Sequence, residues 1–151
     1  MTTRGYATAL VVCATPQDVH AAVTNPRGWW GELVAGGAAV VGEEFTFEVP
    51  GVHWSRLRVA ESEPERVVWD VVDARLEYVE EREEWVGTRI VFELEPVAEG
   101  TRLSFAHDGL LPELACYDSC SVAWTSLIHD SLRRLVTEGR GAPYAGQPLT
   151  G

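Results

Sequence analysis

Apolar and polar residues alternate with a period of two through the middle of the chain. Phe45, Phe47 and Val49 alternate with Glu44, Thr46 and Glu48, which predicts a strand with one buried face. Turns that contain proline or glycine separate further stretches of the same kind. We therefore expect four more strands in an antiparallel meander, over residues 52–61, 66–73, 90–95 and 102–107. The last two flank a short turn and should pair as a hairpin.

The first thirty residues predict one strand followed by two short helices. Residues 6–13 are rich in small and β-branched residues, which is typical of a strand. Thr15 can cap a helix that begins at Pro16 and ends near Val23. The residue before a proline avoids the helical region, so Asn25-Pro26 ends this helix and allows a second one to run through Trp29-Trp30 to Gly31.

The C-terminal part predicts one long helix, from about Glu113 to Glu138. Gly139 follows the last periodic residue and is placed to end it. The helical period puts six apolar residues on one stripe that must be buried: Leu114, Tyr117, Trp124, Ile128, Leu132 and Leu135. We therefore expect a single domain over residues 1–138 and a flexible tail, rich in glycine and proline, over 139–151.

The segment 75–85 gives a weaker signal. It has the length of a further strand, but it contains the charged run Glu80-Glu81-Arg82-Glu83-Glu84. Such a run is typical of a solvated edge or loop rather than of a binding patch. The sequence thus favours one strand, two short helices and then a run of five or six antiparallel strands. These strands and helices can bury their apolar faces together if the sheet curves around the long helix, which is the α+β helix-grip arrangement.

Several motifs make the chain similar to a known superfamily. They are the Trp29-Trp30-Gly31 segment and the stretches Gly87 to Glu93, His107 to Leu110, Cys116 to Trp124 and Ser131 to Gly141. Over residues 5–143 the chain resembles the START-like, birch-pollen-allergen-like SRPBCC superfamily, and within it a bacterial group related to the activator of the heat-shock ATPase. The resemblance implies the helix-grip fold. It leaves function open, because lipid carriers, polyketide cyclases, hormone receptors and co-chaperone modules share this scaffold.

The composition of the chain disfavours nucleic acids and membranes as partners. The chain has 151 residues, 46% of them hydrophobic, and a net charge of -11. That charge has the wrong sign for nucleic acid or an anionic membrane surface, and no apolar run is long enough for membrane insertion. Three cysteines do not make a disulfide framework, so we expect a reducing compartment and a cytoplasmic location.

Many large rings alternate toward the expected concave face of the sheet or lie on the stripe of the long helix. We predict that they line a cavity, although the same rings would also suit a filled core. The predicted ligand-binding residues are Trp30, Phe45, Phe47, Trp54, Trp69, Trp85, Phe92, Phe105, His107, Tyr117, Trp124 and Ile128, with Trp29 and Trp30 near the mouth.

Candidates for chemistry are few. Cys116 and Cys120 lie four residues apart on the predicted helix, the spacing of a metal or redox pair, but two thiols without further ligands favour simple packing. His107 is the strongest candidate base. It follows Leu103 and Phe105 at intervals of two residues, so its side chain should share their concave face of the sheet. No cofactor motif, nucleophile elbow or phosphate loop is present. We therefore predict no cofactor, no metal and no catalytic residue.

Three functions stay open at this point. The first is a carrier or sensor that binds a small hydrophobic or amphipathic ligand between the sheet and the helix. The second, which the resemblance implies, is a protein interaction domain with a chaperone as its partner. The third is a cyclase-type or hydrolytic enzyme that uses the same cavity. The volume and polarity of the interior should distinguish among them.

Overall fold

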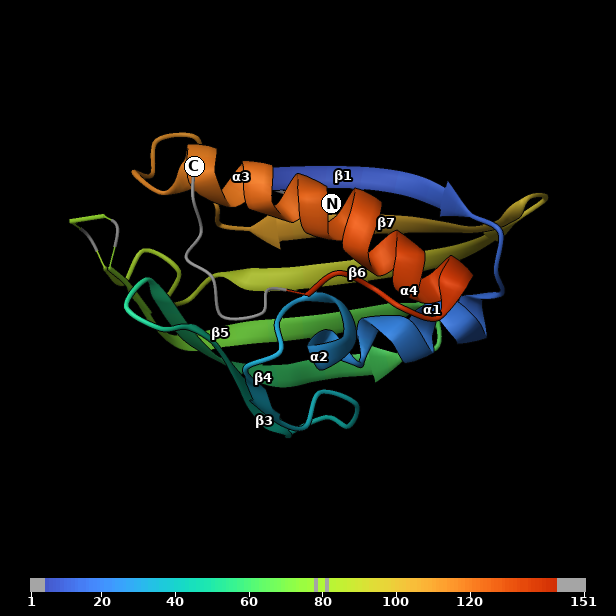
Figure 1. Cartoon of the computed structure of the whole chain (residues 1–151), viewed down its shortest axis with the longest axis horizontal. Helices are drawn as coiled ribbons and strands as arrows, with labels where there is room; N and C mark the ends of the chain where they lie inside the picture. Colours follow the sequence, from blue (N-terminus) through green and yellow to red (C-terminus); the bar gives the residue numbers. More distant parts are fainter. Residues whose placement is uncertain (1–4, 78, 81, 144–151) are drawn as a thin grey trace.

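A computed structural model describes residues 5–77, 79–80 and 82–143, and within them one antiparallel sheet curves around the helices (Figure 1). The strand order is β1-β7-β6-β5-β4-β3-β2. The strands are β1 (Gly5–Val12), β2 (Val34–Gly36), β3 (Glu44–Val49), β4 (His53–Glu63), β5 (Arg66–Leu76), β6 (Arg89–Val97) and β7 (Gly100–Asp108). The predicted helix-grip fold is confirmed.

The sheet has one more strand than the alternation indicated. β2 is only three residues long and pairs with β3 from Val34 opposite Phe47 to Gly36 opposite Phe45. Three residues are too few to display a period of two. The segment 75–85 does not form a separate strand, because β5 continues to Leu76 and the described residues after it form turns.

Two short helices follow β1, as the sequence predicts. Helix α1 (Pro16–Val23) begins at Thr15, whose Oγ1 accepts a hydrogen bond from the Asp18 backbone N–H at 3.1 Å. Helix α2 (Pro26–Trp29) is a single turn. The concave face of the sheet holds both of these helices and the C-terminal helix (Figure 1).

The C-terminal helix begins later than its period indicated, at Tyr117 rather than near Glu113. It runs without a break through α3 (Tyr117–Ser126), η1 (Leu127–Leu132) and α4 (Arg133–Glu138), and ends at Gly139 in the left-handed conformation. Its start depends on a distant side chain, since the Glu84 carboxylate accepts hydrogen bonds from the backbone N–H groups of Ala115 and Cys116, both at 3.0 Å. Local sequence carries no sign of such a cap.

The middle of this helix, η1, is a π-helix. The wider turn buries Leu127, Ile128, Ser131 and Leu132 against the interior, whereas Leu135 one turn later is only partly buried. A stripe drawn with a constant period of 3.6 residues therefore misplaces the deepest contacts. Inserted π-helical turns in α-helices occur frequently at functional sites, which directs attention to the interior beneath η1.

The chain after Gly139 turns back toward α2. The backbone N–H of Ala142 donates to Ser131 Oγ at 2.7 Å, and the same hydroxyl donates to the Trp29 carbonyl at 2.7 Å. Ser131 thus joins the helix, α2 and residues 139–143. Residues 144–151 lie outside the described residues, so the flexibility of the tail stays a prediction.

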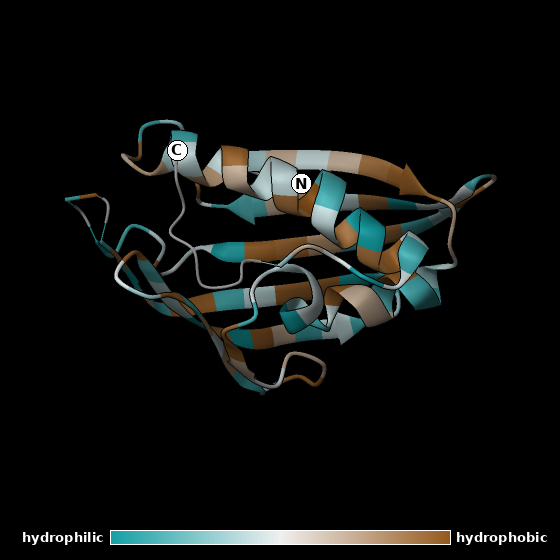
Figure 2. Ribbon diagram, in the orientation of Figure 1, coloured by the Kyte–Doolittle hydropathy of each residue, from teal (hydrophilic) through white to brown (hydrophobic). Residues whose placement is uncertain are grey.

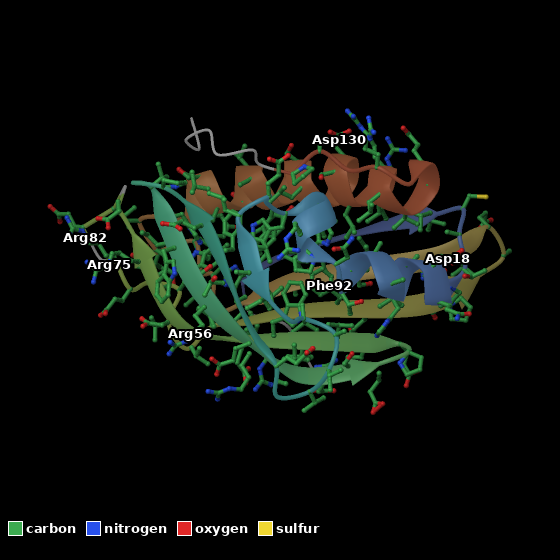
Figure 3. The ribbon with its side chains drawn as sticks, turned by 60° about the horizontal axis from the view of Figure 1, so that its bottom comes forward. Asp18, Arg56, Arg75, Arg82, Phe92 and Asp130 are labelled. Atoms are coloured by element: carbon green, nitrogen blue, oxygen red, sulfur yellow. The ribbon has the colours of Figure 1, made fainter. Side chains whose placement is uncertain are left out.

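Apolar side chains concentrate on one face of the sheet. Figure 2 shows strands that alternate between hydrophobic and hydrophilic residues. In Figure 3 Phe92 lies on the concave side, whereas Arg75 and Arg82 project from one end of the molecule and Arg56 lies on the outside of the sheet. Exposed ion pairs lie on the outer face, such as that of Arg58 with Glu44 at 2.8 Å. Exposed pairs contribute little to stability, so the fold depends on the interior.

Candidate functional site

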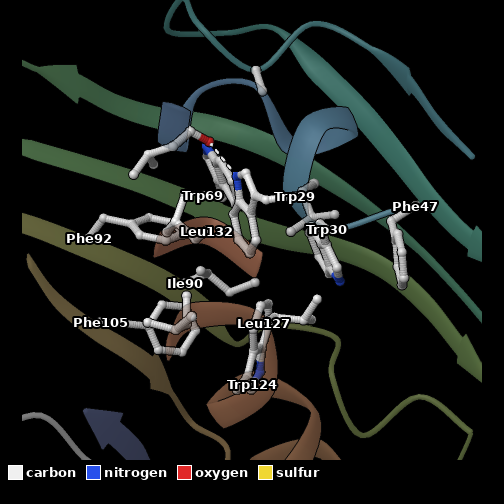
Figure 4. Close-up of a cluster of buried hydrophobic side chains, with 14 of the residues drawn as sticks. Trp29, Trp30, Phe47, Trp69, Ile90, Phe92, Phe105, Trp124, Leu127 and Leu132 are labelled. Carbon is white, nitrogen blue, oxygen red and sulfur yellow. Dashed lines mark hydrogen bonds between the residues drawn. The ribbon is translucent and has the colours of Figure 1, made fainter. Parts of the chain in front are cut away.

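Aromatic rings gather between the concave face of the sheet and the helices (Figure 4). We call them the aromatic cluster. Each ring is at most 4% exposed, and the members are Trp29, Trp30, Phe45, Phe47, Trp69, Trp85, Phe92, Phe105 and Trp124. Every ring buried in this way contributes about 1.5 to 3 kcal/mol through the apolar area it removes from water.

The rings contact one another through the interior. Trp69 packs edge-on against Phe45 and Phe92, with ring centroids 4.9 Å apart in both pairs. Phe105 lies 4.7 Å from Trp124, which brings β7 against the C-terminal helix. These are the distances of direct aromatic contact. Ring atoms therefore fill much of the space that the sequence assigns to a ligand.

The structure brings most of the predicted cavity residues together. Besides the rings of the aromatic cluster, His107 contacts it, with its ring 4.7 Å from that of Trp85, and Ile128 is fully buried in the same core. Tyr117 is only partly buried, at the first residue of α3. Trp29 and Trp30, both predicted near the mouth, are buried members of the cluster.

Trp54 does not lie with the other predicted residues. It is half-buried on the outer face of β4, opposite Glu48 on β3 and Arg75 on β5. The sequence indicates this position, because Trp54 lies two residues before Arg56 on the same strand and must share its face. The residue that faces the cluster from this part of β4 is His53, whose ring lies 4.6 Å from that of Trp85.

A chain of hydrogen bonds crosses one end of the aromatic cluster. Trp124 Nε1, which can only donate, lies 3.0 Å from His107 Nδ1. The neutral imidazole must therefore carry its proton on Nε2, which donates to Thr88 Oγ1 at 2.8 Å, and that hydroxyl donates to the Trp85 carbonyl at 2.6 Å. Both ring nitrogens of His107 are paired, and the network joins the C-terminal helix and β7 to the turn that precedes β6. Sequence reasoning missed Thr88.

Two buried nitrogen atoms in the same interior have no hydrogen-bond partner among the described residues. They are His53 Nδ1 and Trp69 Nε1. The other nitrogen of His53, Nε2, lies 3.1 Å from the hydroxyl of Ser55, a buried residue that sequence reasoning also missed. An unpaired buried polar group costs about 1 to 3 kcal/mol, so each of the two is an unusual feature of an apolar core.

Both buried histidines are uncharged. Burial lowers the pKa of His53 from 6.5 to about 3. Burial, together with the smaller effect of nearby His53, lowers the pKa of His107 to about 3. A base this weak is poorly matched to proton abstraction near neutral pH. The geometry of His107 thus supports a hydrogen-bonding role more than the role of a catalytic base.

Cys116 and Cys120 are buried beside the same end of the cluster. Trp85 Nε1 donates to Cys120 Sγ at 3.4 Å. Hydrogen bonding with Cys120 and burial raise the pKa of the Cys116 thiol above its ordinary value, whereas metal binding and nucleophilic attack need the thiolate. Among the described side chains, no group of three or more histidine, cysteine, aspartate or glutamate residues is placed to hold a metal ion.

A curved antiparallel sheet around a C-terminal helix, with a ring-lined interior between them, defines a START-like helix-grip domain. Within this class, the family model for "Activator of Hsp90 ATPase homolog 1-like protein" matches residues 13–137, and the chain belongs to that family. No curated protein sequence matches the chain closely. In the part of the chain that the structure describes, no helix has both the length and the apolar character required to cross a membrane.

Solved structures agree with this assignment. The chain is 25% identical to a protein of Colwellia psychrerythraea described as an Aha1 dimer, with a TM-score of 0.73 over 93% of this chain and 100% of that one. A protein of Mesorhizobium loti is 17% identical, with a TM-score of 0.70 over 90% and 98% of the two chains. The second likeness concerns the fold alone.

Proposed function

We propose that this protein binds a small, uncharged, apolar or amphipathic molecule between the sheet and the C-terminal helix, as a carrier or sensor. One observation carries the proposal: the aromatic interior contains two buried nitrogen atoms, His53 Nδ1 and Trp69 Nε1, without partners among the described residues. Small-molecule sites are mostly apolar and contain a few polar groups that orient the ligand. A ligand that paired with these atoms would remove the cost of leaving them unsatisfied.

The polarity of the interior supports an uncharged ligand. Among the described residues, the buried polar side chains are histidines, serines and threonines, and none is an acid or an arginine. A buried charge without a counter-charge is strongly unfavourable. The closed packing of the rings also means that the ligand must displace side chains on binding.

The direct test is a titration with N-phenyl-1-naphthylamine, an uncharged probe that fluoresces in apolar surroundings. We expect saturable uptake by the folded protein. Trp124→Ala should weaken the affinity by about 10-fold, which corresponds to the loss of about 1.4 kcal/mol of contact energy. Val122→Ala is the matched control, because Val122 lies on the same helix and is 68% exposed. Equal effects of the two substitutions would indicate surface adsorption, and an absence of uptake would exclude the carrier function.

Family membership favours a second candidate, a protein interaction domain that acts on a chaperone of the Hsp90 class. One surface feature suits it: Val40 and Val41 are 61% and 59% exposed in the loop between β2 and β3. We expect the protein to raise the ATPase rate of such a chaperone, and Val40→Glu with Val41→Glu to reduce the gain by about 10-fold or more, because a contact between apolar surfaces would become charged. An unchanged ATPase rate with the wild-type protein would contradict this candidate.

A further inference from the structure

The Trp30 indole is a buried member of the aromatic cluster and lies between Trp29 and Phe47 (Figure 4). It stacks on Phe47 at 4.4 Å and lies 5.2 Å from Trp124. The plane of Trp69 is parallel to it within 1°, at a centroid distance of 6.2 Å. Further rings surround it at 6.1 to 6.4 Å, those of Trp29, Phe45 and Trp85. Trp30 thus sits in a cage made of six other aromatic rings.

The neighbouring Trp29 is held very differently. Its indole N–H donates to the Val23 carbonyl at 3.4 Å, and its own carbonyl accepts from Ser131 at 2.7 Å. The Trp30 backbone N–H donates to the Pro26 carbonyl within the turn, at 2.7 Å. Trp29 is therefore anchored by two hydrogen bonds, whereas the Trp30 ring is held by its packing in the core.

The segment that carries Trp30 has little regular secondary structure of its own. Helix α2 is one turn long, and the Asn25 side chain does not cap it. The chain then leads into β2, the three-residue strand at the edge of the sheet. Short helices have little stability of their own, and local opening draws on segments with few contacts. Two hydrogen bonds from Arg27 to the Val34 carbonyl, at 2.9 and 2.6 Å, join α2 to the first residue of β2.

We propose that the Trp30 indole occupies the place of the ligand, and that the natural ligand is a flat, uncharged molecule of about two fused aromatic rings that displaces it. This inference rests on the proposed function. The cage selects a flat ring system, because Phe47 and Trp69 present planes nearly parallel to that of Trp30. A hydrogen-bond acceptor at the edge of the ligand would pair with the unpartnered Trp69 N–H.

Calorimetric titration with 2-naphthol tests the displacement. If the open form makes up about 0.1 to 10% of the molecules, removing the competing side chain should tighten binding by about 10- to 1000-fold. We expect this gain in Trp30→Ala and a smaller one in Trp30→Phe. Trp29→Phe and Trp29→Ala are the matched controls. They reduce an equally buried ring on the adjacent residue, and they should bring no gain. The Phe pair keeps the comparison available if the Ala variants do not fold.

Fluorine NMR of protein that contains 5-fluorotryptophan provides the direct readout. The Trp30 resonance is the one absent from Trp30→Phe, and saturating 2-naphthol should move it to the position of a solvent-exposed indole. If the wild-type protein binds 2-naphthol while this resonance stays in place, the displacement is wrong and the proposed binding function stands. Binding by Trp30→Ala alone would show that Trp30 is permanent core and would also overturn the inference. If neither protein binds, the proposed function fails as well.

The charge of the ligand is tested with naphthalene-2-sulfonate, which has the same two rings and a negative charge. We expect it to bind at least about 100-fold more weakly than 2-naphthol to the wild-type protein, since an unpaired charge would have to enter the interior. Equal affinity for the two probes would overturn the assignment of an uncharged ligand.

Discussion

Lowering the pH from 7 to 4.5 should reduce the free energy of unfolding by about 5 kcal/mol through two buried histidines alone. The pKa of His53 and that of His107 fall from 6.5 to about 3 on folding. Below pH 6.5 these two histidines become protonated in the unfolded chain but stay neutral in the folded protein. Each pH unit then costs about 1.4 kcal/mol per histidine, down to pH 3. Above pH 6.5 these two groups contribute no pH dependence.

Urea unfolding at pH 7, 5.5 and 4.5, followed by far-ultraviolet circular dichroism, measures this loss. His53→Phe combined with Ser55→Ala removes one of the two histidines and also the hydroxyl that lies 3.1 Å from its Nε2. The loss between pH 7 and 4.5 should be smaller in this variant by about 2 to 3 kcal/mol. Ser55→Ala alone serves as the control and should keep the full loss. If the free energy of unfolding falls by the same amount in the double variant and the wild-type protein, His53 is not buried in its neutral form.

Trp69→Ala should lower the free energy of unfolding by about 3 to 5 kcal/mol, the range for deleting a large buried ring. Trp69 is fully buried and contacts Phe45 and Phe92 at 4.9 Å. Trp54→Ala is the matched control on the adjacent strand, because Trp54 is half-buried on the outer face. We expect it to cost about 1 kcal/mol or less.

Urea titrations followed by circular dichroism, rather than by tryptophan fluorescence, allow the two variants to be compared directly, since each lacks one indole. A loss of more than about 3 kcal/mol in Trp54→Ala would mean that this ring belongs to the core after all. Trp69→Phe adds a second check. It keeps an aromatic ring and removes the unpartnered Nε1, so it should cost less than Trp69→Ala.

The residues of the candidate site could be predicted well where alternation along a strand determines which face a side chain occupies. Phe45, Phe47 and Phe105 lie where alternation along their strands placed them. The error at Trp54 came from treating every large ring as internal, although the arginines two and four residues later share its face. His53 was then missed as the inward residue of the same strand. Parity, rather than residue type, is the dependable signal.

The sequence by itself determined the α+β helix-grip architecture, most strands, both short helices and the face of nearly every ring, because these depend on periodicity and turn chemistry among near neighbours. Only the tertiary structure decided how the rings pack, since contact between rings depends on volumes that distant segments supply. It also decided where the last helix begins, through Glu84, and which nitrogen of His107 carries the proton, through Trp124. Such contacts join residues far apart in the chain, and a local pattern cannot encode them.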